Sequence, residues 1–170
     1  MPDAVGAQQS RERQVETRRK EGEVTSVHGN RLGQLAIAGF AGHAIPADLK
    51  ALAREFDLGG VIFFARNVES AEQVAELSRQ AQELAGEIPL WVSVDQEGGR
   101  VARLKSPFTE WPPMQALGRS GDVALAERFA RALAEELRAV GISMDYTPVL
   151  DVLTNPKNPV IGDRALAERA

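Results

Sequence analysis

The chain has 170 residues, a formal net charge of −4 and no cysteine. This composition excludes disulfides, thiolate catalysis and cysteine-based zinc sites, and it gives no basic footprint for nucleic acid. Only His28 and His43 supply imidazoles, so neither a metal site nor another cofactor is expected. No apolar run is long enough to cross a membrane, and the N-terminus lacks a signal-peptide core, which favours a cytoplasmic protein.

Residues 1–30 are polar and dense in charges of both signs. Val15 is the only aliphatic side chain between Arg11 and Glu23. Such a segment buries too little apolar surface to order itself. We therefore expect a disordered, charged N-terminal tail over residues 1–30, followed by one domain over residues 31–170.

From Leu32 onward, short apolar runs alternate with amphipathic segments. Strands are expected at residues 35–40, 61–64, 90–95 and 142–146. Helices are expected to begin near Pro46, Ser70 and Asp122, because proline suits the first helical turn and serine and aspartate are good caps. Ser70 followed by Gln73 is also a capping-box pattern. The glycines at 59–60 are expected to end the first helix, and long loops are expected at residues 96–120 and after residue 152.

This alternation predicts an α/β fold with a parallel sheet. The first three strands are centred near residues 37, 62 and 92, a spacing close to the roughly 30 residues of a βα unit in a TIM barrel. The next interval is longer by about the length of the loop at residues 96–120. Four parallel (βα) units therefore indicate either an open four-stranded sheet or the first half of a (βα)8 TIM barrel.

The third strand runs directly into a polar stretch, Asp95-Gln96-Glu97-Gly98-Gly99-Arg100-Val101-Ala102-Arg103. Functional carboxylates in α/β folds lie at the carboxyl ends of parallel strands. The two glycines permit a sharp turn, and the arginines can bind hydroxyl groups or pair with the acids. A strand followed by a charged, solvated turn explains this stretch equally well.

Five acids lie near the expected strand ends or in the loops that follow: Asp95, Glu97, Asp145, Asp151 and Asp163. Paired carboxylates perform glycoside hydrolysis, and the residues alone favour Asp95 with Asp151 as such a pair. The alternative is that these acids hold sugar hydroxyls or pair with the loop arginines. No phosphate-loop pattern is present, and arginines among the acids argue against a cation site.

The remaining aromatic and imidazole side chains carry weaker signals. Trp91 lies within the third strand and is expected in the core. Trp111 lies in the long loop, where packing is expected rather than stacking on a sugar. His43 follows the first strand and is expected to be solvated or to cap a helix.

Four further stretches bear on function: V-D-Q-E-G-G-R-V at 94–101, G-V-I-F-F-A-R-N at 60–67, P-V-L-D-V at 148–152 and N-P-V-I-G-D-R at 158–164. Together they resemble the β-N-acetylhexosaminidases of glycoside hydrolase family 3, over roughly residues 32–165. The resemblance implies a TIM barrel that removes terminal, non-reducing β-linked N-acetylglucosamine. The implied substrates are N-acetylglucosaminyl-anhydromuramyl fragments of bacterial cell-wall recycling, cleaved by a metal-free retaining mechanism.

The resemblance also assigns roles to residues. Asp95, Arg103 and Arg164 match substrate-binding positions, which suits a carboxylate that accepts from sugar hydroxyls and guanidinium forks that fix the ring. The family's acid/base histidine and nucleophilic aspartate fall beyond residue 170. Asp95 and Asp151 then belong to the binding part of the site. The residues after Arg164 depart from the R-S-F-G-like continuation of the family.

The expectation is therefore the N-terminal, substrate-binding half of a hydrolase that acts on a small carbohydrate and is inactive as 170 residues alone. Two alternatives remain: a catalytically inactive sugar-binding half-barrel, and an unrelated four-unit α/β enzyme with its own site at Asp95 and Asp151. A four-stranded sheet with two open edges is also expected to be marginally stable or to self-associate.

Overall fold

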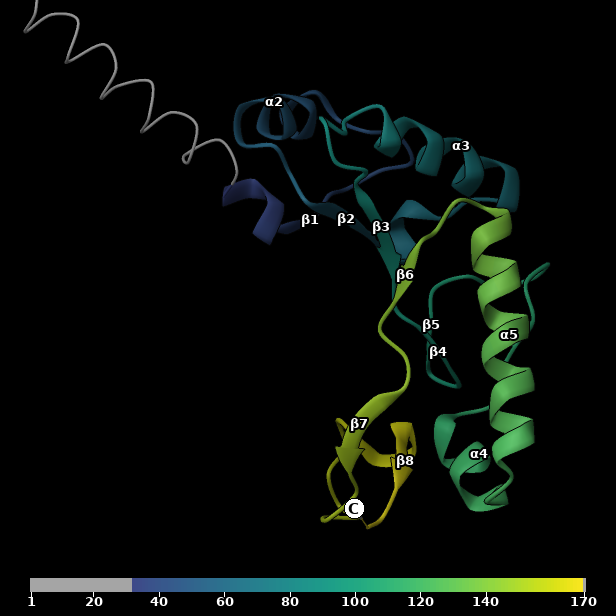
Figure 1. The fold of residues 1–170 in the computed structure, drawn as a ribbon. Coiled ribbons are helices and arrows are strands. Elements are labelled where there is room, and N and C mark those ends of the chain that lie inside the picture. Colours follow the sequence, from purple (N-terminus) through teal and green to yellow (C-terminus); the bar gives the residue numbers. More distant parts are fainter. Residues whose placement is uncertain (1–31, 170) are drawn as a thin grey trace, which may run out of the picture.

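The computed structural model describes residues 32–169 (Figure 1). The tail expected over residues 1–30 lies outside the described residues and stays a prediction. The described part contains a four-stranded sheet and two small two-stranded sheets. None of its helices is long and apolar enough to cross a membrane.

The main sheet consists of β1 (Ile37–Gly39), β2 (Gly60–Phe63), β3 (Trp91–Val94) and β6 (Met144–Asp145), in that spatial order. Every neighbouring pair is parallel. Each strand lies beside the one before it in sequence, as in a barrel built from successive βα units. The predicted parallel (βα) arrangement is confirmed, and the sheet is consistent with part of a TIM barrel. Strands β1, β3 and β6 are two or three residues shorter than expected, whereas β2 has the expected length.

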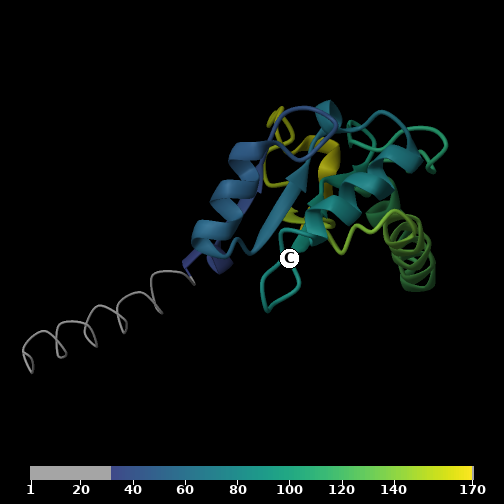
Figure 2. The same ribbon diagram turned by 90° about the horizontal axis from the view of Figure 1, so that it is seen from above.

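Three helices follow the first three strands: α2 (Ala47–Phe56), α3 (Ala71–Gln82) and α5 (Val123–Ala139). Both views place α3 between α2 and α5 in the layer outside the sheet (Figures 1 and 2). Three short 3-10 turns are also present: η1 (Leu32–Leu35), η2 (Ala65–Asn67) and η3 (Gly162–Arg164). The order strand, helix, strand is what the sequence predicts.

The predicted helix caps are present. Ser70 Oγ accepts the backbone N–H of Gln73 at 3.1 Å, and Asp122 Oδ1 accepts that of Leu125 at 3.0 Å. The Gln73 side chain returns a bond to the N–H of Glu69 rather than to that of Ser70. Helix α2 ends before the expected glycine pair, because Asp57 already takes up a left-handed φ of 54°.

The core lies between the main sheet and its helices. Val61, Phe63, Val92 and Val94 are fully buried, and Phe40 packs edge-on against Phe63 with ring centroids 6.0 Å apart. Burying a large apolar side chain contributes roughly 1.5–3 kcal/mol, so these strands account for much of the stability. Strands β2 and β3 are the two inner strands of this sheet, with a neighbouring strand on each side.

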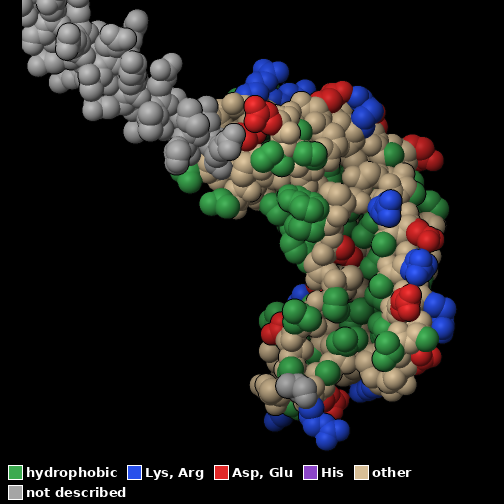
Figure 3. Space-filling view, viewed as in Figure 1, with side chains coloured by type: hydrophobic (Ala, Val, Ile, Leu, Met, Phe, Trp, Pro, Cys, Tyr) green, Lys and Arg blue, Asp and Glu red, His purple; other side chains and the backbone are tan. Residues whose placement is uncertain are grey.

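Trp91 corrects one expectation, since its residue is 53% exposed and the prediction that it lies in the core is wrong. Side chains alternate along a strand, so Trp91 points away from the face that Val92 shares with the helices. No helix covers that other face in the described part of the chain. Figure 3 shows hydrophobic side chains along this hollowed inner side.

The segment expected as a loop at residues 96–120 contains regular structure. Strands β4 (Gln96–Gly98) and β5 (Val101–Ala102) form an antiparallel hairpin, and α4 (Met114–Ser120) follows it. The hairpin turns through Gly98 and Gly99, both at positive φ, and a side chain at Gly98 would lie 2.5 Å from the Pro112 carbonyl oxygen. This turn therefore requires glycine.

The region after β6 also contains strands that the sequence did not predict. Strand β7 (Val149–Val152) pairs in parallel with β8 (Ala165–Ala167), and the segment between them holds η3. Elements of three or four residues produce too little periodicity to be recognised from sequence. Through β8 the chain returns to pack against α4.

Candidate functional site

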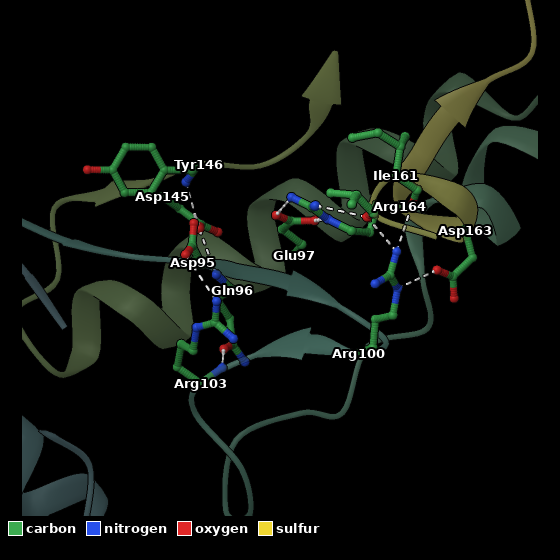
Figure 4. A network of polar contacts seen from close by, with 11 residues as sticks. Asp95, Gln96, Glu97, Arg100, Arg103, Asp145, Tyr146, Ile161, Asp163 and Arg164 are labelled. Atoms are coloured by element: carbon green, nitrogen blue, oxygen red, sulfur yellow. Dashed lines mark hydrogen bonds and ion pairs between the residues drawn. The ribbon is translucent and has the colours of Figure 1, made fainter. Parts of the chain in front are cut away.

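Polar side chains gather at the carboxyl end of the main sheet and in the segments that follow it (Figure 4). Asp95 comes directly after β3, and Asp145 ends the neighbouring strand β6, where it lies opposite Val94 in the register. Figure 4 shows Asp95, Asp145 and Arg103 on one side of the network and Arg100, Asp163 and Arg164 on the other, with Glu97 between. Four of the five acids expected near strand ends, Asp95, Glu97, Asp145 and Asp163, therefore lie in this network.

Asp95 and Arg103 form an ion pair. Arg103 Nη2 donates to Asp95 Oδ2 at 3.1 Å, and the side chains of both residues are about a quarter exposed. Arg103 Nε is buried without a hydrogen-bond partner among the described residues. Two of the three predicted binding residues thus lie together, still partly open to solvent.

The side chain of Gln96 explains how Arg103 reaches Asp95. This residue is 2% exposed, its Oε1 accepts the backbone N–H groups of Arg103 and Leu104 at 2.8 and 3.0 Å, and its Nε2 donates to the Leu104 carbonyl oxygen at 2.9 Å. Three bonds from one buried amide fix the backbone where Arg103 begins. The Gln96 side chain thereby links the start of the hairpin to the backbone that follows it, next to the Asp95–Arg103 ion pair.

Glu97 and Arg164 form a second, more buried pair. Arg164 donates from Nε to Glu97 Oε2 at 2.9 Å and from Nη2 to Oε1 at 2.8 Å, a two-pronged contact. The glutamate side chain is 3% exposed and the arginine 22%. The hydrogen bonds that Arg164 donates to Glu97 raise the pKa of Arg164 above its ordinary value. The third predicted binding residue is thus a permanent cation.

Arg100 ties the hairpin to the segment before β8. Its Nε donates to Asp163 Oδ1 at 2.9 Å, and its Nη2 donates to the carbonyl oxygens of Val160 and Ile161 at 2.6 and 3.0 Å. Both members of the ion pair remain nearly half exposed. Arg100 and Arg164 therefore hold the same segment from two sides.

Asp145 supports the start of the hairpin. Its Oδ1 accepts the backbone N–H groups of Gln96 and Tyr146 at 2.9 and 2.8 Å, while Oδ2 is buried without a partner among the described residues. Burial raises the pKa of Asp145, the two backbone bonds oppose that rise, and the nearby carboxylates of Asp95 and Glu97 add to it.

The structure separates the predicted candidates. Asp151 is exposed on β7, and the acid that adjoins the Asp95 segment is Asp145. Trp111 packs edge-on against Phe129 with centroids 5.0 Å apart, the loop packing that was predicted. His43 is half exposed, and its Nδ1 lies 3.4 Å from Glu69. In residues 32–169 no group of three acids or histidines is placed to hold a metal ion.

Sequence reasoning did not assign the roles of Gln96 and Glu97. Both are buried, although they stand in a polar stretch that is typical of a solvated turn. Their position directly after a buried strand, with a glycine pair behind them, was the signal that could have identified them. The partner of Glu97 lies 67 residues away, and such a pairing cannot be read from a single sequence.

The sequence was compared with family models. The model for the glycosyl hydrolase family 3 N terminal domain matches residues 20–170. The chain belongs to glycosyl hydrolase family 3. The resemblance predicted from the D-Q-E-G-G-R and N-P-V-I-G-D-R stretches is confirmed, and the alternative of an unrelated four-unit enzyme is set aside.

Curated relatives support the same family. A Beta-hexosaminidase of Nitrosomonas eutropha is 47% identical over 114 residues, which are 64% of this chain and 32% of the relative. A Beta-hexosaminidase of Bordetella pertussis is 42% identical over 132 residues, which are 74% of this chain and 37% of the relative. This family 3 chain thus spans about a third of the length of the curated relatives it matches.

Solved structures of family 3 proteins show the same fold. A β-N-acetylglucosaminidase from Paenibacillus sp. superposes with a TM-score of 0.76 at 45% identity, over 81% of this chain and 27% of that one. NagZ from Neisseria gonorrhoeae superposes with a TM-score of 0.70 at 35% identity, over 78% of this chain and 40% of that one. The main sheet and its helices described above therefore have the fold of these family 3 neighbours.

Proposed function

We propose that this chain forms the substrate-binding part of a β-N-acetylhexosaminidase, which removes terminal, non-reducing β-linked N-acetylglucosamine. The observation that carries the proposal is the pair of arginine–carboxylate contacts, Asp95 with Arg103 and Glu97 with Arg164, at the carboxyl end of the parallel sheet. Relatives named Beta-hexosaminidase and a neighbour named β-N-acetylglucosaminidase support the reaction class. NagZ of N. gonorrhoeae has been solved in complex with N-trifluoroacetyl-D-glucosamine, an N-acylated glucosamine.

The chemistry of Asp95, Arg103 and Arg164 suits a pyranose. A carboxylate offers roughly four lone-pair sites, and only one bond to Asp95, from Arg103, is made within the ion pair. Asp95 can therefore accept from neighbouring sugar hydroxyls while Arg103 holds it in place. Arg103 and Arg164 supply donors for the ring and hydroxyl oxygens from two sides, which fixes orientation as well as affinity.

The same contacts favour binding over catalysis. Asp95, Glu97 and Asp163 each accept a hydrogen bond from an arginine in this network, so their oxygens are already engaged in holding other side chains in place. On this proposal the nucleophilic aspartate and the acid/base histidine come from outside these 170 residues, and the reaction is a retaining double displacement. The 170-residue chain alone would bind substrate without cleaving it.

The physiological substrate proposed is an N-acetylglucosaminyl-anhydromuramyl fragment, consumed in cell-wall recycling in the cytoplasm. The support is the similarity to NagZ and the concentration of hydroxyl-binding groups at Asp95, Arg103 and Arg164. A clamp of this kind recognises one terminal sugar and leaves the rest of the ligand less constrained. Comparing affinity for the disaccharide with that for the monosaccharide measures how much the second sugar adds.

The test is a titration of the 170-residue chain with N-acetylglucosamine, followed by amide chemical shifts. We expect saturable shifts near residues 95–103 and 160–164, lost in Asp95→Ala, with glucose as the weaker control ligand. A folded chain that binds neither sugar would overturn the proposal. Release of nitrophenol from an aryl β-N-acetylglucosaminide by this chain alone would refute the division between binding and catalysis.

A further inference from the structure

Glu97 is buried to an unusual degree for a carboxylate. Of the charged side chains in residues 32–169, it alone falls among the buried residues, at 2% exposure. Burying a charge is costly unless an opposite charge and hydrogen bonds compensate for it. Arg164 does so, with one N–H on each carboxylate oxygen. An apolar residue would fill this position at lower cost, so the buried charge calls for a functional reason.

The partner of Glu97 has the opposite character, because Arg164 is both partly exposed and proposed to touch the sugar. A guanidinium carries five N–H donors. Within the described residues Arg164 donates two of them to Glu97 and one, from Nη1, to the Val160 carbonyl oxygen at 3.2 Å. One donor on each terminal nitrogen therefore remains for a ligand.

Arg164 needs to be held by something, since it lies on the short turn η3 in a segment with few buried residues. An arginine side chain has many rotamers. If none is fixed beforehand, the entropy lost when a ligand fixes one of them weakens the binding of that ligand. Glu97, which lies in the hairpin 67 residues earlier in the chain, accepts hydrogen bonds from two nitrogens of the guanidinium and so fixes its plane. The hairpin and the segment that contains η3 are thereby joined through the Arg164 guanidinium, the group proposed to contact the sugar.

We propose that Glu97 is the positioning residue of the sugar clamp, holding Arg164 in one orientation before substrate arrives and not contacting the substrate itself. The proposal rests on the proposed function in one respect, namely that Arg164 contacts the sugar. It gives the D-Q-E-G-G-R stretch a division of labour. Asp95 binds, Gln96 sets the backbone of Arg103, Glu97 sets the side chain of Arg164, and Arg100 holds the segment that carries it.

The spectroscopic test follows the Nε–H signal of Arg164 in a 15N–1H correlation spectrum of the full 170-residue chain. We expect a resolved signal in the wild type, because the Nε–H is bonded to Glu97, and its loss in Glu97→Gln. The Nε–H of Arg100, which bonds Asp163 in the same segment, is the internal control and is expected to persist. Loss of both signals would show that the segment has simply detached, which would overturn a specific positioning role.

The binding test measures N-acetylglucosamine affinity in the same variants. We expect Glu97→Gln to weaken affinity about tenfold, because the ligand must then order Arg164 itself. Asp163→Asn, which releases the more exposed Arg100, is the matched control and is expected to weaken affinity less than about threefold. Wild-type affinity in Glu97→Gln, with the Arg164 signal lost, would overturn the positioning role and leave the proposed function intact.

Two further variants keep the test decisive. Glu97→Asp is the substitute if Glu97→Gln fails to fold. It retains the charge, but its shorter side chain cannot reach both nitrogens of Arg164, so we expect an affinity between those of the wild type and Arg164→Ala. Exchanging the pair, Glu97→Arg with Arg164→Glu, restores the contact but removes the sugar-facing arginine. Full affinity in that exchanged chain would show a purely structural contact and overturn the proposal, whereas wild-type affinity in Arg164→Ala would count against the proposed function.

Discussion

In the main sheet, Val61, Phe63 and Val92 are buried among aliphatic and aromatic side chains, whereas at the site Arg103 and Arg164 pack against carboxylates. The sheet gains its stability from area removed from water, which depends little on which apolar residue supplies it. The site depends on individual pairs with defined geometry, which no similar residue replaces. The scaffold should therefore tolerate conservative changes that the site cannot.

The largest effect is expected in the sheet. Phe63→Ala would leave a cavity at a fully buried position that packs on Phe40, and we expect a loss of about 4 kcal/mol in the free energy of unfolding, measured by urea denaturation. Val123→Ala, at a position 83% exposed, is the matched control and is expected to change stability by less than about 0.5 kcal/mol. Equal losses in the two variants would contradict the division between core and surface.

The next largest effect is expected at Gln96. Gln96→Ala removes three hydrogen bonds and leaves buried backbone groups of residues 103–104 without partners, so we expect a loss of about 3 kcal/mol and a weakened Asp95–Arg103 contact. Urea denaturation measures the first and sugar affinity the second. Gln80→Ala, on the exposed face of α3, should change neither. Undiminished sugar affinity in Gln96→Ala would show that the hairpin does not depend on this amide.

A smaller effect with a defined pH dependence is expected at Asp145. Its pKa is raised on folding by burial, with Asp95 and Glu97 as the facing carboxylates, so the folded chain binds this proton more tightly than the unfolded chain. Stability should consequently fall as pH rises from the ordinary aspartate pKa through the raised value. Asp145→Asn keeps an acceptor for the Gln96 and Tyr146 N–H groups and should remove this part of the slope.

Above that pH window, Asp145→Asn is expected to be more stable than the wild type by about 1 kcal/mol, because it carries no unpartnered charge at the buried oxygen. Melts across acid to neutral pH measure the slope. Glu135→Gln, an exposed position on α5, is the control that leaves the slope unchanged. An Asp145→Asn chain that retains the wild-type slope would locate the titration elsewhere.

The smallest effect is expected for an ion pair outside the site. Arg131 Nη2 lies 3.1 Å from Glu127 Oε1 on α5, and both side chains are more than two-thirds exposed. Solvent screens such a pair and its side chains lose entropy to make it. Arg131→Gln should therefore melt together with the wild type within experimental error. A clear loss would mean that arginine–carboxylate contacts stabilise this chain wherever they occur, and the contrast between site and surface would disappear.

The sequence predicted the repeating layer well because each strand and helix has its own local signal. The apolar runs ending at Phe64 and Asp95, and the caps at Ser70 and Asp122, needed no information from elsewhere in the chain. Trp91 was misplaced because a strand's two faces look alike until it is known which of them a helix covers. The hairpin, α4 and the β7–β8 pair were missed because each element has only two to seven residues and shows too little periodicity.

At the site, the place of a functional carboxylate could be predicted from sequence, but the ion-pair partners of the side chains could not. A carboxylate after a buried parallel strand marks the carboxyl edge of a sheet, so Asp95 could be found from sequence alone. The roles of Arg103 and Arg164 came from the family resemblance and remain proposals. That Glu97 pairs with Arg164, and that Asp145 rather than Asp151 adjoins the Asp95 segment, depends on contacts between distant parts of the chain that no local pattern encodes.

The arginine contacts between the hairpin and the segment before β8 also bear on the order in which parts of the chain fold. Glu97 and Arg164 are 67 residues apart, and Arg100 and Asp163 are 63, whereas β1 and β2 pair across only 23. Closing longer loops costs more entropy, so the sheet can grow unit by unit before these contacts form. By the same reasoning they are the first to open in the folded chain. The contacts of Glu97 with Arg164 and of Arg100 with Asp163 would thus be among the last to form, and the segment at residues 160–164 among the first to exchange its amide hydrogens.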